Sequence, residues 1–130
     1  MSLDSDLKAM AHGKNFAALT TLMADGQPQT QIMWVGATDD QIVINTQVDR
    51  QKYRNVIADP RVTVTVFDAD NPYRYVEARG SVARTQDGPT AAANIDELSQ
   101  KYMGQPYGMG PTDARVILFI DVDRVHKNGF

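Results

Sequence analysis

The sequence predicts a mainly β, α+β domain, a small antiparallel barrel of six strands with two to three short helices. Short β-branched runs recur along the chain, and most of them are separated by turns that contain Gly, Pro, Asn or Asp. No β-α-β repeat is present, which argues against an open parallel sheet. A chain of 130 residues fits one domain, and no linker divides it, so residues 1–130 are expected to form a single unit.

The N-terminal part of the chain predicts one helix followed by strands. A helix is expected at 5–14, where apolar residues recur at helical spacing and a glycine lies near the end. The runs 16–23 and 29–35 flank a turn that contains Gly and Pro, which predicts a hairpin. A third strand is expected at 41–46, after a second polar turn.

The middle of the chain predicts a short helix between longer strands. The helix covers about 50–58, with Asp49 placed to cap its first turn, and an Asp-Pro pair ends it. The run 61–67 alternates valine with polar residues, which is typical of a half-buried strand. A long strand is expected at 73–85, in which Gly80 marks a bulge or bend.

The C-terminal part predicts a packing helix, a loop and a last strand. The helix 89–103 begins with a proline, has one apolar face and ends at a glycine. The next residues are rich in Gly and Pro and predict a loop. The strand 115–122 is apolar enough to be buried.

Composition excludes several classes of function. The chain has no cysteine, which excludes a disulfide scaffold, thiol catalysis and thiolate metal sites. Its net charge of -3 disfavours nucleic acid as a partner, since that affinity depends on many Lys and Arg contacts. No apolar run is long enough to span a membrane, and the N-terminus lacks the pattern of a signal peptide, so a cytoplasmic location is expected.

One local excess of positive charge stands out against this acidic background. Arg50, Lys52 and Arg54 crowd the start of the helix at 50–58, directly after a strand. Free backbone N–H groups at a helix start attract anions, so the segment predicts a site for a phosphate. The alternative is an ordinary solvated surface, and charge alone does not decide between them.

Three motifs in a fixed order carry a family resemblance. They are the helix start 50–55 (Arg-Gln-Lys-Tyr-Arg-Asn), the strand start 59–62 (Asp-Pro-Arg-Val) and the segment 71–75 (Asn-Pro-Tyr-Arg-Tyr). Over about residues 14–125 the chain resembles the pyridoxamine 5'-phosphate oxidase-like split β-barrel superfamily. Within it, the chain looks like the small actinobacterial branch that uses the deazaflavin coenzyme F420 in place of FMN.

The resemblance implies a homodimer with two cofactor sites at the subunit interface. A small split barrel would also otherwise expose a large apolar groove. Carried over position by position, the expected contacts to the cofactor ring come from Thr30, Gln31, Ile32, Met33, Trp34 and Val35. Those to the ribityl chain and phosphate come from Asn45, Thr46, Arg50 and Lys52, and Tyr75 is expected to reach the partner subunit's site.

Two departures from the FMN enzymes bear on the cofactor and the substrate. FMN oxidases usually carry Arg directly before the phosphate-binding Lys, whereas this chain has Gln51, which favours F420 and leaves Arg50 or Arg54 to supply the charge. Their C-terminal substrate-binding extension has no counterpart after Phe130, so vitamin B6 oxidation is not expected.

The function that the resemblance implies is an F420-dependent reductase, which passes hydride to an electron-poor double bond of an apolar small molecule. The cofactor carries the two electrons, so no catalytic side chain and no metal site are expected, and His12 and His126 are interpreted as surface or packing residues. One alternative is an FMN-binding oxidoreductase of the same fold. Another is a carrier that binds a flavin, a deazaflavin or haem without turnover.

A few side chains keep two interpretations. Trp34 either stacks on the cofactor ring or fills the barrel. Tyr107, in the Gly-rich loop with Met109, either lines a substrate pocket or covers the barrel mouth. The strand carboxylates Glu77 and Asp121 are expected to pair with an arginine such as Arg79 or Arg115.

Overall fold

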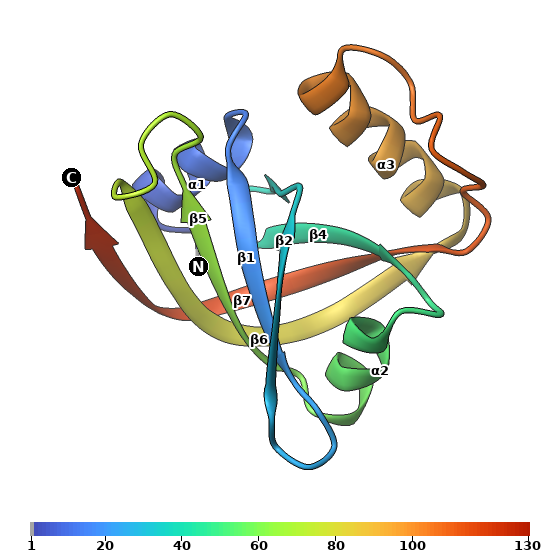
Figure 1. Ribbon diagram of the computed structural model, residues 1–130, viewed down its shortest axis with the longest axis horizontal. Helices are drawn as coiled ribbons and strands as arrows, with labels where there is room; N and C mark the ends of the chain where they lie inside the picture. Colours follow the sequence, from blue (N-terminus) through green and yellow to red (C-terminus); the bar gives the residue numbers. More distant parts are fainter. Residues whose placement is uncertain (1) are drawn as a thin grey trace.

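Seven antiparallel strands form one curled sheet in the computed structural model, which describes residues 2–130 (Figure 1). The strands are β1 (Phe16–Leu22), β2 (Pro28–Met33), β3 (Gly36–Ala37), β4 (Ile42–Gln47), β5 (Arg61–Phe67), β6 (Tyr75–Asp87) and β7 (Arg115–Asn128). The helices are α1 (Ser5–His12), α2 (Gln51–Ala58) and α3 (Gly88–Met103). The strand order in the sheet is β2-β1-β5-β6-β7-β4-β3, with every pairing antiparallel.

The antiparallel α+β class is confirmed, but the expected count of six strands is wrong. The additional strand, β3, has two residues, which is too short to give any alternation in the sequence. The sheet is also not closed, because β2 and β3 lie at its opposite ends in the described residues. The last strand runs to Asn128 rather than to residue 122, since its polar second half pairs with β6 outside the core.

Local sequence explains where the helices begin and end. The Asp4 side chain accepts hydrogen bonds from the N–H groups of Asp6 and Leu7 at the start of α1. At α2 the expected cap by Asp49 is wrong, since the N-cap is Arg50 and no side chain caps the first turn. Helix α3 ends at Gly104, whose φ of 73° is the left-handed conformation that glycine favours.

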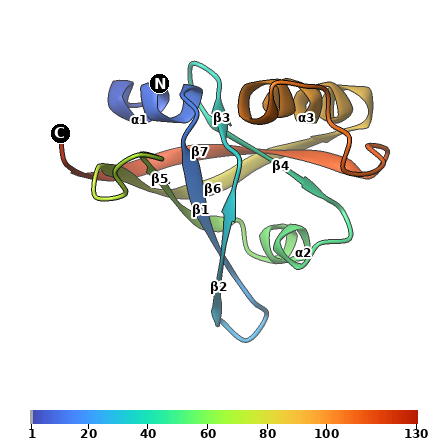
Figure 2. The ribbon, with the colours of Figure 1, turned by 45° about the horizontal axis from the view of Figure 1, so that its top comes forward.

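Strand alternation separates two packing faces. The inner face buries valines and isoleucines of β4, β5, β6 and β7 together with apolar residues of α1 and α2. The outer face of β4 and β7 buries Val43, Ile117 and Phe119 against Ala91 of α3. In the view of Figure 2, α1 and α3 lie above the long strands β6 and β7, and α2 lies below them. No helix in residues 2–130 has the length and apolar character needed to cross a bilayer.

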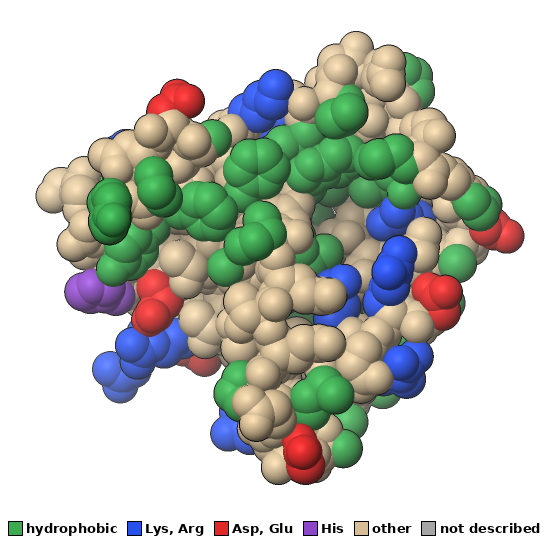
Figure 3. Space-filling view, in the orientation of Figure 1, with side chains coloured by type: hydrophobic (Ala, Val, Ile, Leu, Met, Phe, Trp, Pro, Cys, Tyr) green, Lys and Arg blue, Asp and Glu red, His purple; other side chains and the backbone are tan. Residues whose placement is uncertain are grey.

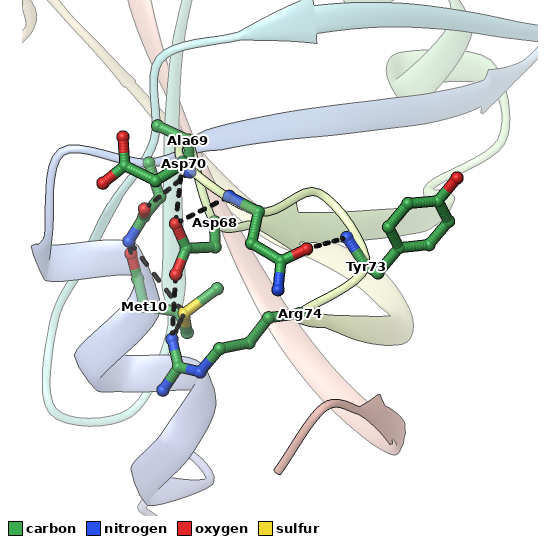
Figure 4. Close-up of polar contacts among 8 residues, drawn as sticks. Met10, Asp68, Ala69, Asp70, Tyr73 and Arg74 are labelled. Carbon is green, nitrogen blue, oxygen red and sulfur yellow. Dashed lines mark hydrogen bonds and ion pairs between the residues drawn. The ribbon is translucent and has the colours of Figure 1, made fainter.

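The turn between β5 and β6 is fixed by its own side chains (Figure 4). Asp68 accepts from the N–H groups of Asp70 and Asn71, at 2.8 and 3.3 Å, and its other oxygen lies 3.4 Å from Arg74 Nη1. Arg74 also reaches the sulfur of Met10 at 3.0 Å, which ties the turn to α1. In this chain the Asn-Pro-Tyr-Arg segment therefore shapes a turn.

Strands β6 and β7 form the longest pairing, and their register shifts between Arg79 and Gly80, which confirms the expected irregularity there. Arg79 Nε donates to Glu77 Oε1 at 2.9 Å, as expected. The expected arginine partner of Asp121 is wrong, because Asp121 accepts from Gln41 Nε2 at 2.9 Å.

Replacing Gly80 by alanine should destabilise the fold. A Cβ at Gly80 would lie 1.8 Å from the carbonyl oxygen of Asp121 on β7, so the two strands would have to move apart. We expect Gly80→Ala to lower the free energy of unfolding by about 1–3 kcal/mol, as overpacking does. The matched control is Gly108→Ala, since nothing lies within 4 Å of a Cβ there. Urea unfolding of both variants checks this, and equal midpoints for Gly80→Ala and wild type would contradict it.

Candidate functional site

A groove of about 340 Å³ lies between α3, β2, the start of β7 and the first turn of α2. Figure 3 shows hydrophobic side chains along one side of a hollow in the surface and Lys and Arg side chains across from them. The groove is lined by Phe16, Gln31, Ile32, Met33, Trp34, Asn45, Lys52, Ile95, Leu98, Tyr107, Met109 and Arg115. It therefore joins an apolar half to a positively charged end.

Trp34 forms part of the apolar half. Its ring stacks on Tyr102 of α3, with centroids 5.1 Å apart and planes 3° from parallel, while the side chain lines the groove. It packs with Phe16 against the cluster of Ile95, Leu98 and Tyr102 outside the barrel. The interpretation that Trp34 fills the barrel is therefore wrong, and its stacking on a cofactor ring stays a prediction.

Lys52 forms the charged end with its neighbours. Its side chain is half-buried, and within residues 2–130 no carboxylate lies at ion-pair distance from its ammonium. Burial lowers the pKa of Lys52, and the positive charges of Arg50 and Arg115 lower this pKa further. Three cations that repel one another and lack a counter-charge favour an anion at this end of the groove.

Two buried polar atoms at this end of the groove lack a hydrogen-bond partner in the described part of the chain: Oδ1 of Asn45 and Nε of Arg115. The Asn45 amide is held in place because its Nδ2 donates to Ala91 O at 2.9 Å and to Asn94 Oδ1 at 3.0 Å. An unpaired buried polar group costs stability, so its presence points to a ligand. Both residues line the groove, so one acceptor and one cationic donor lie at its wall.

Arg115 is positioned by the loop that follows α3. Its Nη2 donates to the hydroxyl of Tyr107, and its guanidinium lies 4.8 Å from the centroid of the same ring. The N–H of Tyr107 donates to Asp96 Oδ1 of α3 at 3.0 Å. The loop is therefore fastened to α3 and presents Arg115 and Tyr107 together to the groove.

The structure brings several of the sequence-predicted cofactor contacts to the groove, and others lie outside its lining. The predicted residues that line it are Gln31, Ile32, Met33, Trp34, Asn45 and Lys52. Arg50 lies exposed at the start of α2, close enough to Lys52 to affect its pKa. Cofactor contact by any of these residues stays a prediction.

The remaining predicted contacts lie elsewhere for physical reasons. Asn45 and Thr46 are neighbours in β4, so they point to opposite faces, and Thr46 is buried on the face of Ile42 and Ile44. The Thr30 hydroxyl lies 2.7 Å from that of Thr20 on the neighbouring strand. Val35 is fully buried in the core.

Tyr75 lies away from the groove of its own chain. It starts β6, pairs with Phe67 and Asn128, and its ring centroid is 6.4 Å from that of His126. Its expected contact with the partner subunit's site stays a prediction.

Arg54 is directed to the other side of α2. Its two terminal nitrogens donate to Asp49 O at 2.9 Å and to Gln51 Oε1 at 2.8 Å. The Nε2 atom of Gln51 donates to Asn55 Oδ1 at 2.7 Å. Neither Gln51 nor Arg54 lines the groove, so Arg50 and Arg115 are the cations nearest to Lys52.

Sequence reasoning missed several lining residues. Ile95 and Leu98 were expected only as the packing face of α3, and Phe16 only as a strand residue. Arg115 was expected to pair with a strand carboxylate. The missed signal was alternation: Arg115 shares the outer face of β7 with Ile117 and Phe119, the face on which α3 packs. Tyr107 and Met109 line the groove, and their contact with a substrate stays a prediction.

Comparison with known proteins identifies the family. The family model described as pyridoxamine 5'-phosphate oxidase matches residues 3–129. The chain belongs to this family. A solved structure named F420 reductase is 32% identical over 97% of this chain and 100% of its own, with a TM-score of 0.82. A conserved hypothetical protein from Mycobacterium tuberculosis, Rv2991, is 25% identical over 96% of this chain and 83% of its own, with a TM-score of 0.75.

A more distant structure of the same fold is named for a different role. HutZ, the haem storage protein from Vibrio cholerae, is 13% identical over 100% of this chain and 97% of its own, with a TM-score of 0.66. At that identity the likeness shows the fold alone. No curated protein matches the sequence.

Removing the charge of Lys52 should stabilise the ligand-free fold. A lysine whose pKa is lower in the folded than in the unfolded state costs stability while it is protonated; the cost is full below the folded pKa, falls as the pH rises past it, and is gone above the unfolded pKa. We expect Lys52→Met to raise the free energy of unfolding at neutral pH, by an amount that shrinks toward alkaline pH. The control is Lys14→Met at an exposed site. Urea unfolding at several pH values measures both, and a loss of stability in Lys52→Met at neutral pH would refute this account.

Proposed function

We propose that this protein is an F420-dependent reductase, which transfers hydride from the reduced deazaflavin to an electron-poor double bond of an apolar small molecule. The observation that carries the proposal is the composition of the groove. An apolar wall around Trp34 leads to a cluster of unpaired cations at Lys52, and two other lining residues, Asn45 and Arg115, each have a buried polar atom without a partner in residues 2–130.

The residues present fit a cofactor built from an aromatic ring, a hydroxylated chain and a phosphate. A hydroxyl of the chain would donate to Asn45 Oδ1, which has no other donor in residues 2–130. A phosphate would accept from Lys52 and Arg115, with Arg50 adding charge at the start of α2. The ring would lie against the apolar half formed by Ile32, Met33 and Trp34.

When bound, the deazaflavin supplies the two electrons and the hydride, so the protein contributes binding, orientation and the exclusion of water. The apolar side chains of Phe16, Ile95, Leu98 and Met109 support an apolar substrate, since they leave it few polar partners. Hydride transfer requires an electrophilic acceptor, and an electron-poor double bond is one. The proton that completes its reduction would come from solvent, since no side chain of the groove is assigned a proton-transfer role.

Two observations favour the deazaflavin over FMN. The likeness to the F420 reductase spans both chains almost completely at 32% identity. Gln51, at the position where the FMN enzymes usually carry an arginine, is turned to Arg54 and Asn55 and adds no charge to the groove. The positive charge therefore comes from Lys52, Arg50 and Arg115.

The proposal is tested on cofactor-free protein by parallel titration with F420 and FMN. We expect tighter binding of F420, followed in stopped-flow experiments by oxidation of the reduced cofactor when apolar enones are added. Lys52→Met should weaken F420 binding by about 1–3 kcal/mol, the usual loss for a charge-assisted contact, while Lys14→Met should not.

The outcomes separate the candidate functions. Tighter binding of FMN would indicate an FMN-dependent oxidoreductase of the same fold. Binding without oxidation by any acceptor would indicate a carrier. Equal affinities of wild type and Lys52→Met for F420 would contradict the proposed contact between Lys52 and the phosphate.

We further propose that the protein is a homodimer and that the second copy covers the groove. Ile32 and Met109 line the groove, yet they are 61% and 64% exposed in the single chain. Strand β2, which carries Ile32, is an end strand of the sheet with one free edge. Light scattering at micromolar concentration should give twice the mass of the 14.4 kDa chain, and a monomer mass would contradict the proposal.

A further inference from the structure

The chain crosses from one end of the sheet to the other at Trp34 and Val35. Strands β2 and β3 are consecutive in the sequence but lie at opposite ends of the strand order. Trp34 and Val35 lie between these two strands and belong to neither, so they take no part in strand pairing. Val35 is nevertheless fully buried, and buried backbone groups need partners.

Two consecutive side chains of α3 supply these partners. The N–H of Val35 donates to the hydroxyl of Tyr102 at 3.1 Å, and the carbonyl oxygen of Val35 accepts from Lys101 Nζ at 2.6 Å. Lys101 also donates to the carbonyl oxygen of Ala11 at 2.9 Å, and the Tyr102 hydroxyl donates to that of Asn15. The crossing, the last turn of α1 and the start of β1 are thus fastened to one point of α3.

The same two residues fix the neighbouring tryptophan. The ring of Tyr102 stacks on Trp34 at 5.1 Å, and the ammonium of Lys101 lies 4.7 Å from the centroid of the Tyr102 ring. Trp34 lines the groove next to Met33. Its position therefore depends on α3, because strand pairing stops one residue before it.

We propose that Lys101 and Tyr102 are positioning residues: they hold the Trp34–Val35 crossing and so set the wall against which the cofactor ring binds. The effect on binding rests on the function proposed above, whereas the effect on Trp34 does not. Neither Lys101 nor Tyr102 lines the groove, so both act on it indirectly, through Val35 and Trp34.

The charge of Lys101 gives this arrangement a measurable signature. The ammonium is held by neutral carbonyl oxygens, with no carboxylate at ion-pair distance in residues 2–130. Burial lowers the pKa of Lys101 to about 8. The other titratable side chains that line the same outer pocket are His12 of α1 and Glu97 of α3.

Trp34 is the only tryptophan of the chain, so tryptophan fluorescence reports this site alone. In cofactor-free protein we expect the emission of Trp34 to change with a midpoint near the pKa of Lys101, about 8. Lys101→Met should abolish this transition, and Lys52→Met, which alters another lysine near the groove, should retain it. A transition that survives in Lys101→Met, or none in wild type, would overturn the role of Lys101.

Tyr102→Phe tests the role of the Tyr102 hydroxyl. It keeps the aromatic ring but removes the hydroxyl, so the amide hydrogen of Val35 should exchange faster and F420 should bind about tenfold more weakly, which corresponds to about 1.4 kcal/mol. The control Tyr73→Phe removes an exposed hydroxyl and should change neither quantity. Unchanged exchange at Val35 would overturn the proposal.

These measurements separate the two proposals. If wild type binds neither F420 nor FMN, the proposed function fails, while Trp34 emission and Val35 exchange still decide the positioning role. If Tyr102→Phe does not fold, the pH titration of wild type and Lys101→Met decides it. If both cofactor-free signals change as expected but F420 affinity does not, the claim that the crossing sets the binding wall is overturned.

Discussion

The need to pair the buried backbone of Val35 governs how the rest of this structure is arranged. The sheet curls without closing, so the chain must pass between its two end strands outside any ladder. Only side chains can satisfy the backbone there, and they come from α3 through Lys101 and Tyr102. Once α3 is docked at this point, its Ile95 and Leu98 form the back of the groove.

The groove itself is built at some cost to the fold. Lys52 is half-buried among cations, and Asn45 and Arg115 each leave a buried atom without a partner. Buried charges and polar groups without partners oppose folding. A site with only a structural role would be expected to carry apolar or paired groups instead. Their presence on one surface, beside an apolar wall, is what distinguishes this groove from the other hollows of the molecule.

Family membership establishes the fold of this protein, whereas the proposal for its function depends on the residues of the groove. The motifs that carry the family resemblance do not all serve a ligand: the Asn-Pro-Tyr-Arg segment lies in a turn held by Asp68 and Arg74. The cation-rich helix start instead faces the groove through Lys52. A shared fold supports several functions, so the proposal for this chain depends on the groove residues and the nature of their unpaired groups.

The sequence by itself determined the helices, nearly all strand positions, the irregularity at Gly80 and the gathering of cations at the start of α2, because each depends on local periodicity or local charge. It could also have separated Asn45 from Thr46, since neighbours in a strand point to opposite faces. Tertiary structure alone decided that Arg115 would join the groove, that Trp34 would stack on Tyr102, and that a lysine of α3 would pair with Val35. These contacts join residues far apart in the chain, and their partners depend on how the curled sheet and α3 pack, which no local pattern contains.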